Sequence, residues 1–373
     1  MRVHTRLAAL AALITAAGAA GLAAPSAATA QDPFIGPFGQ VTTIASTVPG
    51  NGDQNPYGTV LIKHDEGDLR KGDVLVSNFN NAANLQGTGT TLVQVAPDGT
   101  ASQFAQIDPN NLPGPCPGGV GLTTALTVLP GGWVVVGSLP TTDGSSATAS
   151  AGCLLVLDKH GRVRETLAGD GINGPWDMTS ASHGDHTDLY VTNVLNNTQA
   201  GGGNEVDEGT VLRISLRDGV GDEPPRREST TVIGSGFGEK TDPSALVIGP
   251  TGVALNHDGT LYVADTVGNR ITEIRHADTR PDSAGTGRVV TSGGDLNGPL
   301  GLARTPCGDL LTVNSLDGFI VETTPHGEQV AKFQLDSSGT GVPGAGALFG
   351  LAVDDNSGVY FVDDAGNQLD LFH

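Results

Sequence analysis

One short pattern recurs six times along this 373-residue chain and restricts the fold more than any other feature. Each copy is an apolar strand that ends in a polar residue, as in Leu-Tyr-Val-Ala-Asp, which ends at Asp265. The six strand ends are Asn78, Ser138, Asn193, Asp265, Asn314 and Asp363. From 78 to 363 is 285 residues over five intervals, a mean of 57. A repeat of this length predicts an array of small sheets rather than two unrelated domains.

A Pro-x-Gly-like leading motif stands before each of these strands and keeps the same order along the chain. The motifs are Pro56-Tyr57-Gly58, Gly119-Val120-Gly121, Pro175-Trp176-Asp177, Pro250-Thr251-Gly252, Pro299-Leu300-Gly301 and Leu348-Phe349-Gly350. A turn follows each first strand, and further strands follow each second one, so each unit predicts a four-stranded antiparallel sheet. No segment after residue 31 has a sustained helical period, and the 55 glycines suit an all-β chain.

The last unit lacks a fourth strand because the chain ends at His373, shortly after its third strand. An alternating β-branched segment, 40–47, precedes the first leading motif and belongs to no unit of its own. If this segment completes the last sheet, the array closes into a ring without an open edge. We therefore expect a single domain over 40–373, with 31–39 as a lead-in.

The fourth unit resembles the NHL repeat, which builds six-bladed β-propellers. The resemblance rests on the stretch from Gly249 to Arg275, with its Pro-x-Gly, Asp-Gly, Leu-Tyr-Val-Ala-Asp and Asn-Arg-Ile elements. It implies an all-β, six-bladed propeller of four-stranded antiparallel blades, closed by the N-terminal strand. The gluconolactonase/SMP-30-like and amidating-lyase propellers share this superfamily.

The first thirty residues have the features of a secretory signal peptide. Arg2 and Arg6 precede an apolar run, and an Ala-x-Ala site ends at Ala30. Cleavage there changes the formal charge from −21 to −23, because two of the 19 Lys and Arg are lost against 40 Asp and Glu. Such a chain lacks the clustered cations that nucleic acid or an anionic membrane requires. We expect a secreted, extracellular monomer without a membrane span after cleavage.

In an antiparallel four-stranded blade, the start of the first strand and the loop after the second strand lie at the same end. The leading motifs and the strand-end residues therefore share one face, the mouth face, around the central channel. We predict a ligand-binding surface there. Its residues are Tyr57, Asn78, Trp176, Asp177, Asn193, Thr251, Asp265, Asn314, Phe349 and Asp363. The alternative for the repeated Asn and Asp residues is structural, with side chains that bond loop amides and join blades.

Asp177 is a departure from the pattern, because the other five leading motifs have glycine at its position. A carboxylate there could ligate calcium or another divalent cation, or act as a general base. The alternative is a turn aspartate that bonds to its own backbone.

The sequence thus leaves two functions open. One is a module that binds a small molecule, glycan, peptide or extracellular protein. The other is a metal-assisted hydrolase, lactonase- or esterase-like, or a lyase that uses Asp177 with nearby Asn and Asp oxygens.

The catalytic residues of the related enzymes are not found here. The amidating lyases place histidines around the channel, whereas the histidines that we could place, such as His183 and His186, fall in turns at the opposite, far face. The gluconolactonase-like propellers use a Glu at the start of the first blade, where this chain has Tyr57. No metal set or catalytic set follows from the resemblance.

The blade topology also sorts the three cysteines. Cys116 precedes the first strand of the second unit and Cys153 begins its third strand, so both lie at the mouth end of one blade. In an exported protein they are expected to form a disulfide. Cys307 lies in a far-face turn and is expected to be unpaired.

Overall fold

The computed structural model describes Met1 and residues 32–243 and 245–373. The proposed signal peptide, apart from Met1, lies outside the described residues. These residues form no helix with the length and hydropathy that a membrane span requires. Residues 33–373 form one unit.

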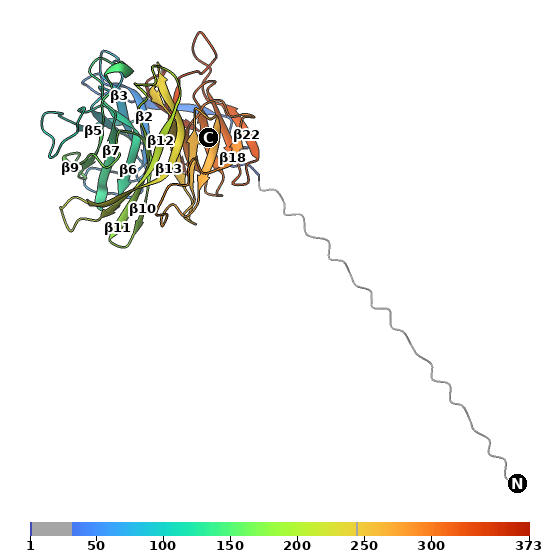
Figure 1. Ribbon diagram of the computed structural model, residues 1–373. Helices are drawn as coiled ribbons and strands as arrows, with labels where there is room; N and C mark the ends of the chain where they lie inside the picture. The colour runs from blue at the N-terminus through green and yellow to red at the C-terminus, as the bar shows by residue number, and fades with distance from the viewer. Residues whose placement is uncertain (2–31, 244) are drawn as a thin grey trace. The chain divides into compact units, whose positions relative to one another are not determined.

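This unit is a ring of six antiparallel sheets, which follow one another in chain order (Figure 1). Blade one contains β2 (Gln54–Leu61), β3 (Val74–Asn80), β4 (Thr91–Val95) and β5 (Ala101–Gln106). Blade two contains β6 (Leu122–Leu129), β7 (Trp133–Ser138), β8 (Cys153–Leu157) and β9 (Val163–Leu167). Blade three contains β10 (Gly174–His183), β11 (His186–Val194), β12 (Val206–Arg217), β13 (Arg226–Asp242) and β14 (Leu246–Ile248).

The other three blades have four strands each. Blade four contains β15 (Pro250–Leu255), β16 (Leu261–Asp265), β17 (Arg270–Ile274) and β18 (Arg288–Ser292), and blade five β19 (Pro299–Arg304), β20 (Leu310–Asn314), β21 (Phe319–Thr323) and β22 (Gln329–Gln334). Blade six contains β23 (Leu348–Asp354), β24 (Gly358–Asp363), β25 (Gln368–Phe372) and β1 (Val41–Ser46). The predicted six-bladed propeller is confirmed, and blade three adds the short fifth strand β14.

The N-terminal strand closes the ring, as the sequence predicts. β1 pairs with β25, from Val41 opposite Phe372 to Ser46 opposite Gln368. The lead-in before β1 is also attached, because the backbone amides of Phe34 and Ile35 donate to the buried carboxylate of Glu322 in blade five. β1 is therefore the outermost strand of the last blade and covers the edge of β25, and the two ends of the propeller domain depend on each other.

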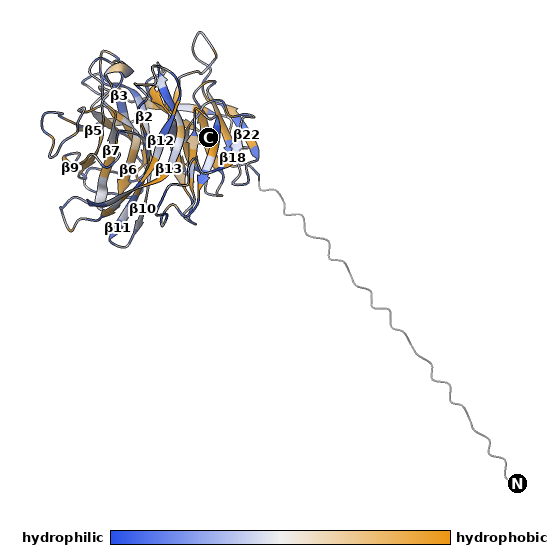
Figure 2. Cartoon of the chain, viewed as in Figure 1, coloured by the Kyte–Doolittle hydropathy of each residue, from blue (hydrophilic) through white to orange (hydrophobic). Residues whose placement is uncertain are grey.

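The first strand of each blade lines the central channel and contacts the first strands of its neighbours, including β23 with β2. Apolar residues fill the spaces between sheets, and Figure 2 shows hydrophobic colour along the strands and hydrophilic colour in the loops. All six first strands begin at the mouth face, so their C-terminal ends lie towards the far face.

The structure corrects the leading motif of blade two. Pro56, Pro175, Pro250, Pro299 and Leu348 pair with the strand-end residues of their own blades. In blade two the residue that pairs with Ser138 is Leu122. The equivalent motif is therefore Leu122-Thr123-Thr124, and not Gly119-Val120-Gly121. Gly119 and Gly121, just upstream, have the spacing of the motif. Only the strand pairing shows that the motif itself begins at Leu122.

Cys116 and Cys153 form the expected disulfide, with Cα atoms 5.3 Å apart, and Cys307 is free and exposed. Cys153 is completely buried at the start of β8, so the bond fixes the segment before blade two to the sheet interior.

Replacing Cys153 with Ala should raise the thiol count of the denatured, unreduced protein from one to two. Opening a crosslink that spans 37 residues should also lower the free energy of unfolding by about 4 kcal/mol on a chain-entropy estimate. Thiol titration and urea denaturation measure the two effects. Cys116→Ser is the matched control, since it should give the same count by freeing Cys153. A count that stays at one in either variant would disprove the pairing.

Candidate functional site

Four glycines of the leading motifs lie where adjacent blades meet most closely around the channel. They are Gly58, Gly252, Gly301 and Gly350. A Cβ atom at any of them would collide with a main-chain oxygen of the next blade. Asp177 has this position in blade three, whereas blade two has one more residue in its bulge, so that Thr124 and Ala125 together lie there. These neighbouring blades therefore bring a hydroxyl and a carboxyl to a position that elsewhere has no side chain.

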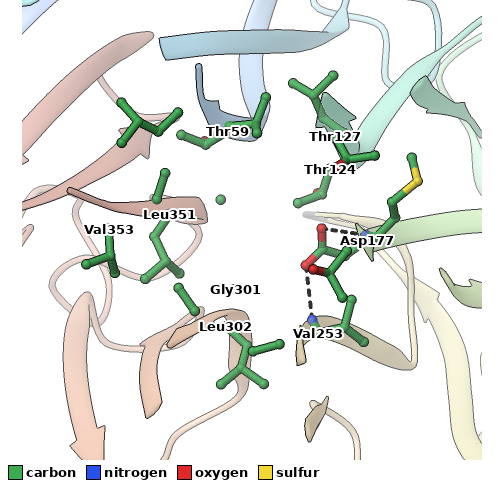
Figure 3. A pocket seen from close by; sticks show the side chains of 18 of the residues that line it. Thr59, Thr124, Thr127, Asp177, Val253, Gly301, Leu302, Leu351 and Val353 are labelled. Carbon is green, nitrogen blue, oxygen red and sulfur yellow. Dashed lines mark hydrogen bonds between the residues drawn. The ribbon is translucent and has the colours of Figure 1, made fainter. Parts of the chain in front are cut away.

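Asp177 joins blade three to blade four. Its Oδ1 accepts a hydrogen bond from Met178 N at 2.8 Å, and its Oδ2 accepts one from Val253 N at 3.2 Å (Figure 3). The residue is partly accessible, although its carboxyl group is enclosed by protein atoms. Burial raises the pKa of Asp177 to about 7, and the two amide hydrogen bonds offset only part of that effect. This carboxyl group therefore changes charge near neutral pH.

Asp177 lines a cavity of about 260 Å³ inside the channel. The lining begins at the glycine position and follows the first strands towards the far face (Figure 3). Blades one to three contribute the hydroxyls of Thr59, Thr124, Thr127 and Thr179 and the carboxyl of Asp177. Blades four to six contribute mainly alkyl groups, such as those of Leu302, Leu351 and Val353. The cavity therefore has a polar half and an apolar half.

Two cations also line this cavity, Lys63 just after β2 and Arg304 at the end of β19. Lys63 is exposed, and Arg304 is half-buried. Asp177 is the only acidic residue in the lining. The balance favours a ligand with negative charge, even though the whole chain is strongly acidic.

Three polar atoms of this lining are buried without a hydrogen-bond partner among the described residues. They are the hydroxyl oxygens of Thr59 and Thr124 and the Nε of Arg304. A buried polar group without a partner costs about 1–3 kcal/mol, so each of these side chains would gain by turning towards a hydrogen-bonding molecule in the cavity. The combination of Asp177, four threonines and two cations around one cavity makes this the best-supported candidate site in the described part of the chain.

The three aromatic residues predicted at the mouth lie together in a buried stack. Tyr57 and Phe349 have ring centroids 3.9 Å apart, and Trp176 lies 6.3 Å from Tyr57 and 6.5 Å from Phe349. Each is at most 3% exposed. Their cluster includes Ala245, Leu246 and Val247, from the connection that ends blade three, and Trp176 Nε1 donates to Val247 O at 2.9 Å. The stack fills the channel at the mouth face, which leaves the cavity at Asp177 directed towards the far face.

The predicted polar residues at the strand ends make local structural contacts. The amide nitrogens of Asn78, Asn193 and Asn314 each donate to a main-chain oxygen in the segment that leads into their own blade. Asp265 accepts from Arg270 Nε at 2.7 Å, and Asp363 accepts from Gly366 N at 3.2 Å. These contacts agree with the structural alternative for this repeated position. Their role in ligand binding stays a prediction.

Thr251 is completely buried, and its hydroxyl donates to Leu300 O of the next blade at 3.0 Å. It too holds adjacent blades together.

The mouth face has a separate cavity of about 410 Å³ beside this stack. It is lined by Phe349 and Leu300, by Lys240 and Asp242 of β13, and by loop residues of blades four to six such as Asn269. A second, more open cavity of about 470 Å³ lies among the loops after β7 and β11. If the mouth-face ligand predicted from the sequence exists, these two cavities have room for it.

Sequence reasoning missed Thr59, Thr124, Lys63 and Arg304. Thr124 was missed because the leading motif of blade two was placed three residues too early in the chain, at Gly119 instead of Leu122. Thr59 was missed because the sequence does not show which first-strand side chains lack a partner.

The donor set at Asp177 does not fit a resident divalent cation. No group of three or more His, Cys, Asp or Glu residues able to hold a metal occurs in the described residues. Both carboxyl oxygens of Asp177 already accept amide hydrogen bonds, and the only other side-chain oxygens of the described lining are neutral threonine hydroxyls. Calcium sites use several carboxylate and carbonyl oxygens around one point.

No protein-family model and no curated protein matches the chain. Solved structures with a similar fold include the calcium-binding protein regucalcin from Agrobacterium tumefaciens, with a TM-score of 0.53 and 14% identity over 88% of this chain and 95% of that one. A gluconolactonase from Xanthomonas campestris has a TM-score of 0.51 and 14% identity over 89% and 88% of the two chains. A luciferin-regenerating enzyme has a TM-score of 0.52 and 12% identity over 87% and 88%. At these identities the likeness establishes the six-bladed propeller fold alone, and the NHL resemblance stays a prediction.

The raised pKa of Asp177 predicts a contribution to stability that falls as pH rises. The folded state holds this proton more tightly than the unfolded chain, so the contribution is fully present below about pH 4 and is lost as pH rises through about 7. The slope is at most about 1.4 kcal/mol per pH unit for one group. Asp177→Asn removes the titrating group. The wild-type free energy of unfolding minus that of Asp177→Asn should therefore fall between pH 5 and 8, measured by urea denaturation at each pH. A difference that is constant or rises over this range would contradict the raised pKa.

Proposed function

We propose that the protein binds a small polyhydroxylated acid in its central channel. The observation that carries the proposal is a single cavity whose lining combines four threonines and Asp177 with two cations, Lys63 and Arg304. A volume of about 260 Å³ lies just below the usual range for drug-sized ligands, so it suits a small molecule rather than a polymer. Threonine hydroxyls and the Asp177 carboxyl serve ligand hydroxyls, and Lys63 and Arg304 serve a carboxylate.

We also propose that the protein acts outside the cell. The Cys116–Cys153 disulfide supports this, because such bonds persist in oxidising compartments.

Calorimetric titration with D-gluconate and with sorbitol tests the channel site. The two probes share a six-carbon polyol chain, and only gluconate has a carboxylate, so gluconate should bind more tightly. Thr124→Val keeps the shape of the side chain and removes one hydroxyl, and it should weaken gluconate binding about two- to tenfold.

Thr272→Val is the matched control, because Thr272 also has a buried hydroxyl without a partner but lies in β17, outside the cavity lining. Equal binding of the two probes, or equal effects of the two valine variants, would rule out the proposed site.

A second function, hydrolysis of a small lactone or ester, is favoured by the pKa of about 7 at Asp177. A carboxyl group with this pKa is suited to general acid–base catalysis at neutral pH. The ionised carboxylate would take a proton from water while the water oxygen bonds to the carbonyl carbon. The carbon–oxygen bond to the leaving alcohol would then break, and the protonated Asp177 would return the proton to that oxygen. This proposal needs no metal, in contrast to the metal-assisted hydrolase predicted from the sequence.

A pH-stat assay with glucono-δ-lactone tests the hydrolase. The value of kcat/KM should rise with pH through about 7 and then level off, because the ionised form is the base. Asp177→Asn should lower it about 100- to 10,000-fold. Activity should survive treatment with EDTA. An Asp177→Asn variant as fast as the wild type excludes this base, and EDTA-sensitive activity restored by calcium would favour the metal-assisted mechanism.

A further inference from the structure

A second candidate site lies at the far face of blades two and three. Two adjoining cavities of about 270 Å³ and 230 Å³ share Gly131, Trp133 and Gly221 in their linings. We call this pair of cavities the Trp133 groove. Its walls are the turns that follow β6 and β8 and the connection between β12 and β13. None of its lining residues belongs to the channel cavity.

Cations are concentrated in this groove. Lys159, Arg162 and Arg164 lie within six residues of a chain that has 19 Lys and Arg against 40 Asp and Glu. Neither the ammonium of Lys159 nor the guanidinium of Arg162 forms an ion pair or hydrogen bond with the described residues. His160 and Arg164 also line the groove, and each is about 40% exposed although paired with Asp68 and Asp158 respectively.

Three aspartates also line the groove, but two of them are engaged within the fold. Asp218 accepts the Thr187 hydroxyl at 2.9 Å. Asp158 is buried, and it accepts the backbone amides of His160 and Arg162 as well as Arg164 Nη1. Its carboxylate therefore organises the turn rather than facing a ligand. Asp222 is exposed and opposes the cations from the β12–β13 connection, where its main-chain oxygen accepts from Arg164 Nη2 at 3.5 Å.

Trp133 adds an N–H donor to the groove. Its ring packs in the core between blades two and three and is 8% exposed, and its Nε1 makes no hydrogen bond to the described residues. Gly131 leaves the indole edge uncovered, because a Cβ there would lie 3.7 Å from Cδ1 and 3.8 Å from Nε1 of Trp133. The indole N–H is therefore accessible beside the cations.

We propose that the Trp133 groove binds the tetrahedral oxyanion of a small phosphate or sulfate ester. The lining offers an ammonium, two guanidiniums, an imidazole and an indole N–H as donors. Of these, the Lys159 ammonium, the Arg162 guanidinium and the Trp133 N–H have no partner among the described residues, whereas His160 and Arg164 are already paired. Guanidinium groups match such oxyanions with paired hydrogen bonds. A tetrahedral oxyanion has three terminal oxygens to accept these bonds, whereas a carboxylate has two. The size of the two cavities admits an organic group attached to the oxyanion.

Calorimetric titration of the purified protein at low salt tests the groove, with glucose 6-phosphate, glucose 6-sulfate, glucuronate and glucose as probes. The phosphate ester, the sulfate ester or both should bind. The tighter of the two shows whether the groove prefers a phosphate or a sulfate. Glucuronate should bind more weakly, and glucose should not bind. Higher salt should weaken the binding. Binding of glucose or glucuronate as tight as that of the better ester, or no ester binding at millimolar concentration, would overturn the proposal.

Charge variants locate the binding. Arg162→Gln removes an exposed, unpaired guanidinium and should weaken ester binding about tenfold or more. Lys71→Gln is the matched control, because it removes an equal charge from another exposed turn and should leave the affinity unchanged. Asp222→Asn should increase the affinity. Equal losses in Arg162→Gln and Lys71→Gln would show general charge attraction and would overturn the proposal.

Trp133→Phe provides a test without a change in charge, since phenylalanine keeps an aromatic ring in the core and lacks the N–H donor. It should weaken ester binding about two- to tenfold. Thr124→Val, in the channel, should have no effect on the groove, so the two sites can fail or succeed separately. Unchanged ester binding in both Trp133→Phe and Arg162→Gln would place the anion elsewhere.

Discussion

The architecture depends on how closely the first strands of adjacent blades approach each other around the channel. Gly252, Gly301 and Gly350 leave no room for a side chain, because the main chain of the next blade occupies that space. Where blades three and four meet, Asp177 replaces glycine and its carboxyl accepts the Val253 amide of blade four. One residue thus both joins two blades and brings a titratable group into the channel. One blade earlier Thr124 adds a hydroxyl to the lining, and with Asp177 it contributes to the polar half of the cavity.

The two ends of the channel differ for a related reason. At the mouth face the Tyr57 and Phe349 rings stack, and the segment that contains Val247 packs against their cluster. Blade three has a fifth strand, β14, and Leu246 and Val247 of this strand supply the cover together with Ala245. Among the described residues no aromatic stack lines the channel cavity at the far face, and its lining includes Lys63, just after β2, and Arg304, at the end of β19. Both candidate sites, the channel cavity and the Trp133 groove, therefore belong to the far half of the propeller.

The sequence predicts features set by strand periodicity and chain order. It predicts six blades, closure of the ring by residues 40–47, the Cys116–Cys153 pair and the unpaired Cys307, and the structure confirms all four. It does not predict what covers a surface. Trp176 has the same sequence pattern whether it faces solvent or lies under a segment 70 residues further along the chain. That difference depends on packing between blades, which a repeat pattern does not contain.

The protonation of Asp177 separates the two functions proposed for the channel. A ligand oxygen that accepts a hydrogen bond needs the protonated carboxyl, so binding of such a ligand is favoured below the pKa of about 7. General-base catalysis needs the ionised carboxylate, so the rate is favoured above it. Glu239 and Asp364 are also buried with pKa values raised to about 8 and 7, but neither lines the channel cavity. Their protonation acts on the stability of the fold. An effect of pH on affinity or rate that disappears in Asp177→Asn therefore reports on the channel, whereas one that persists comes from elsewhere in the propeller.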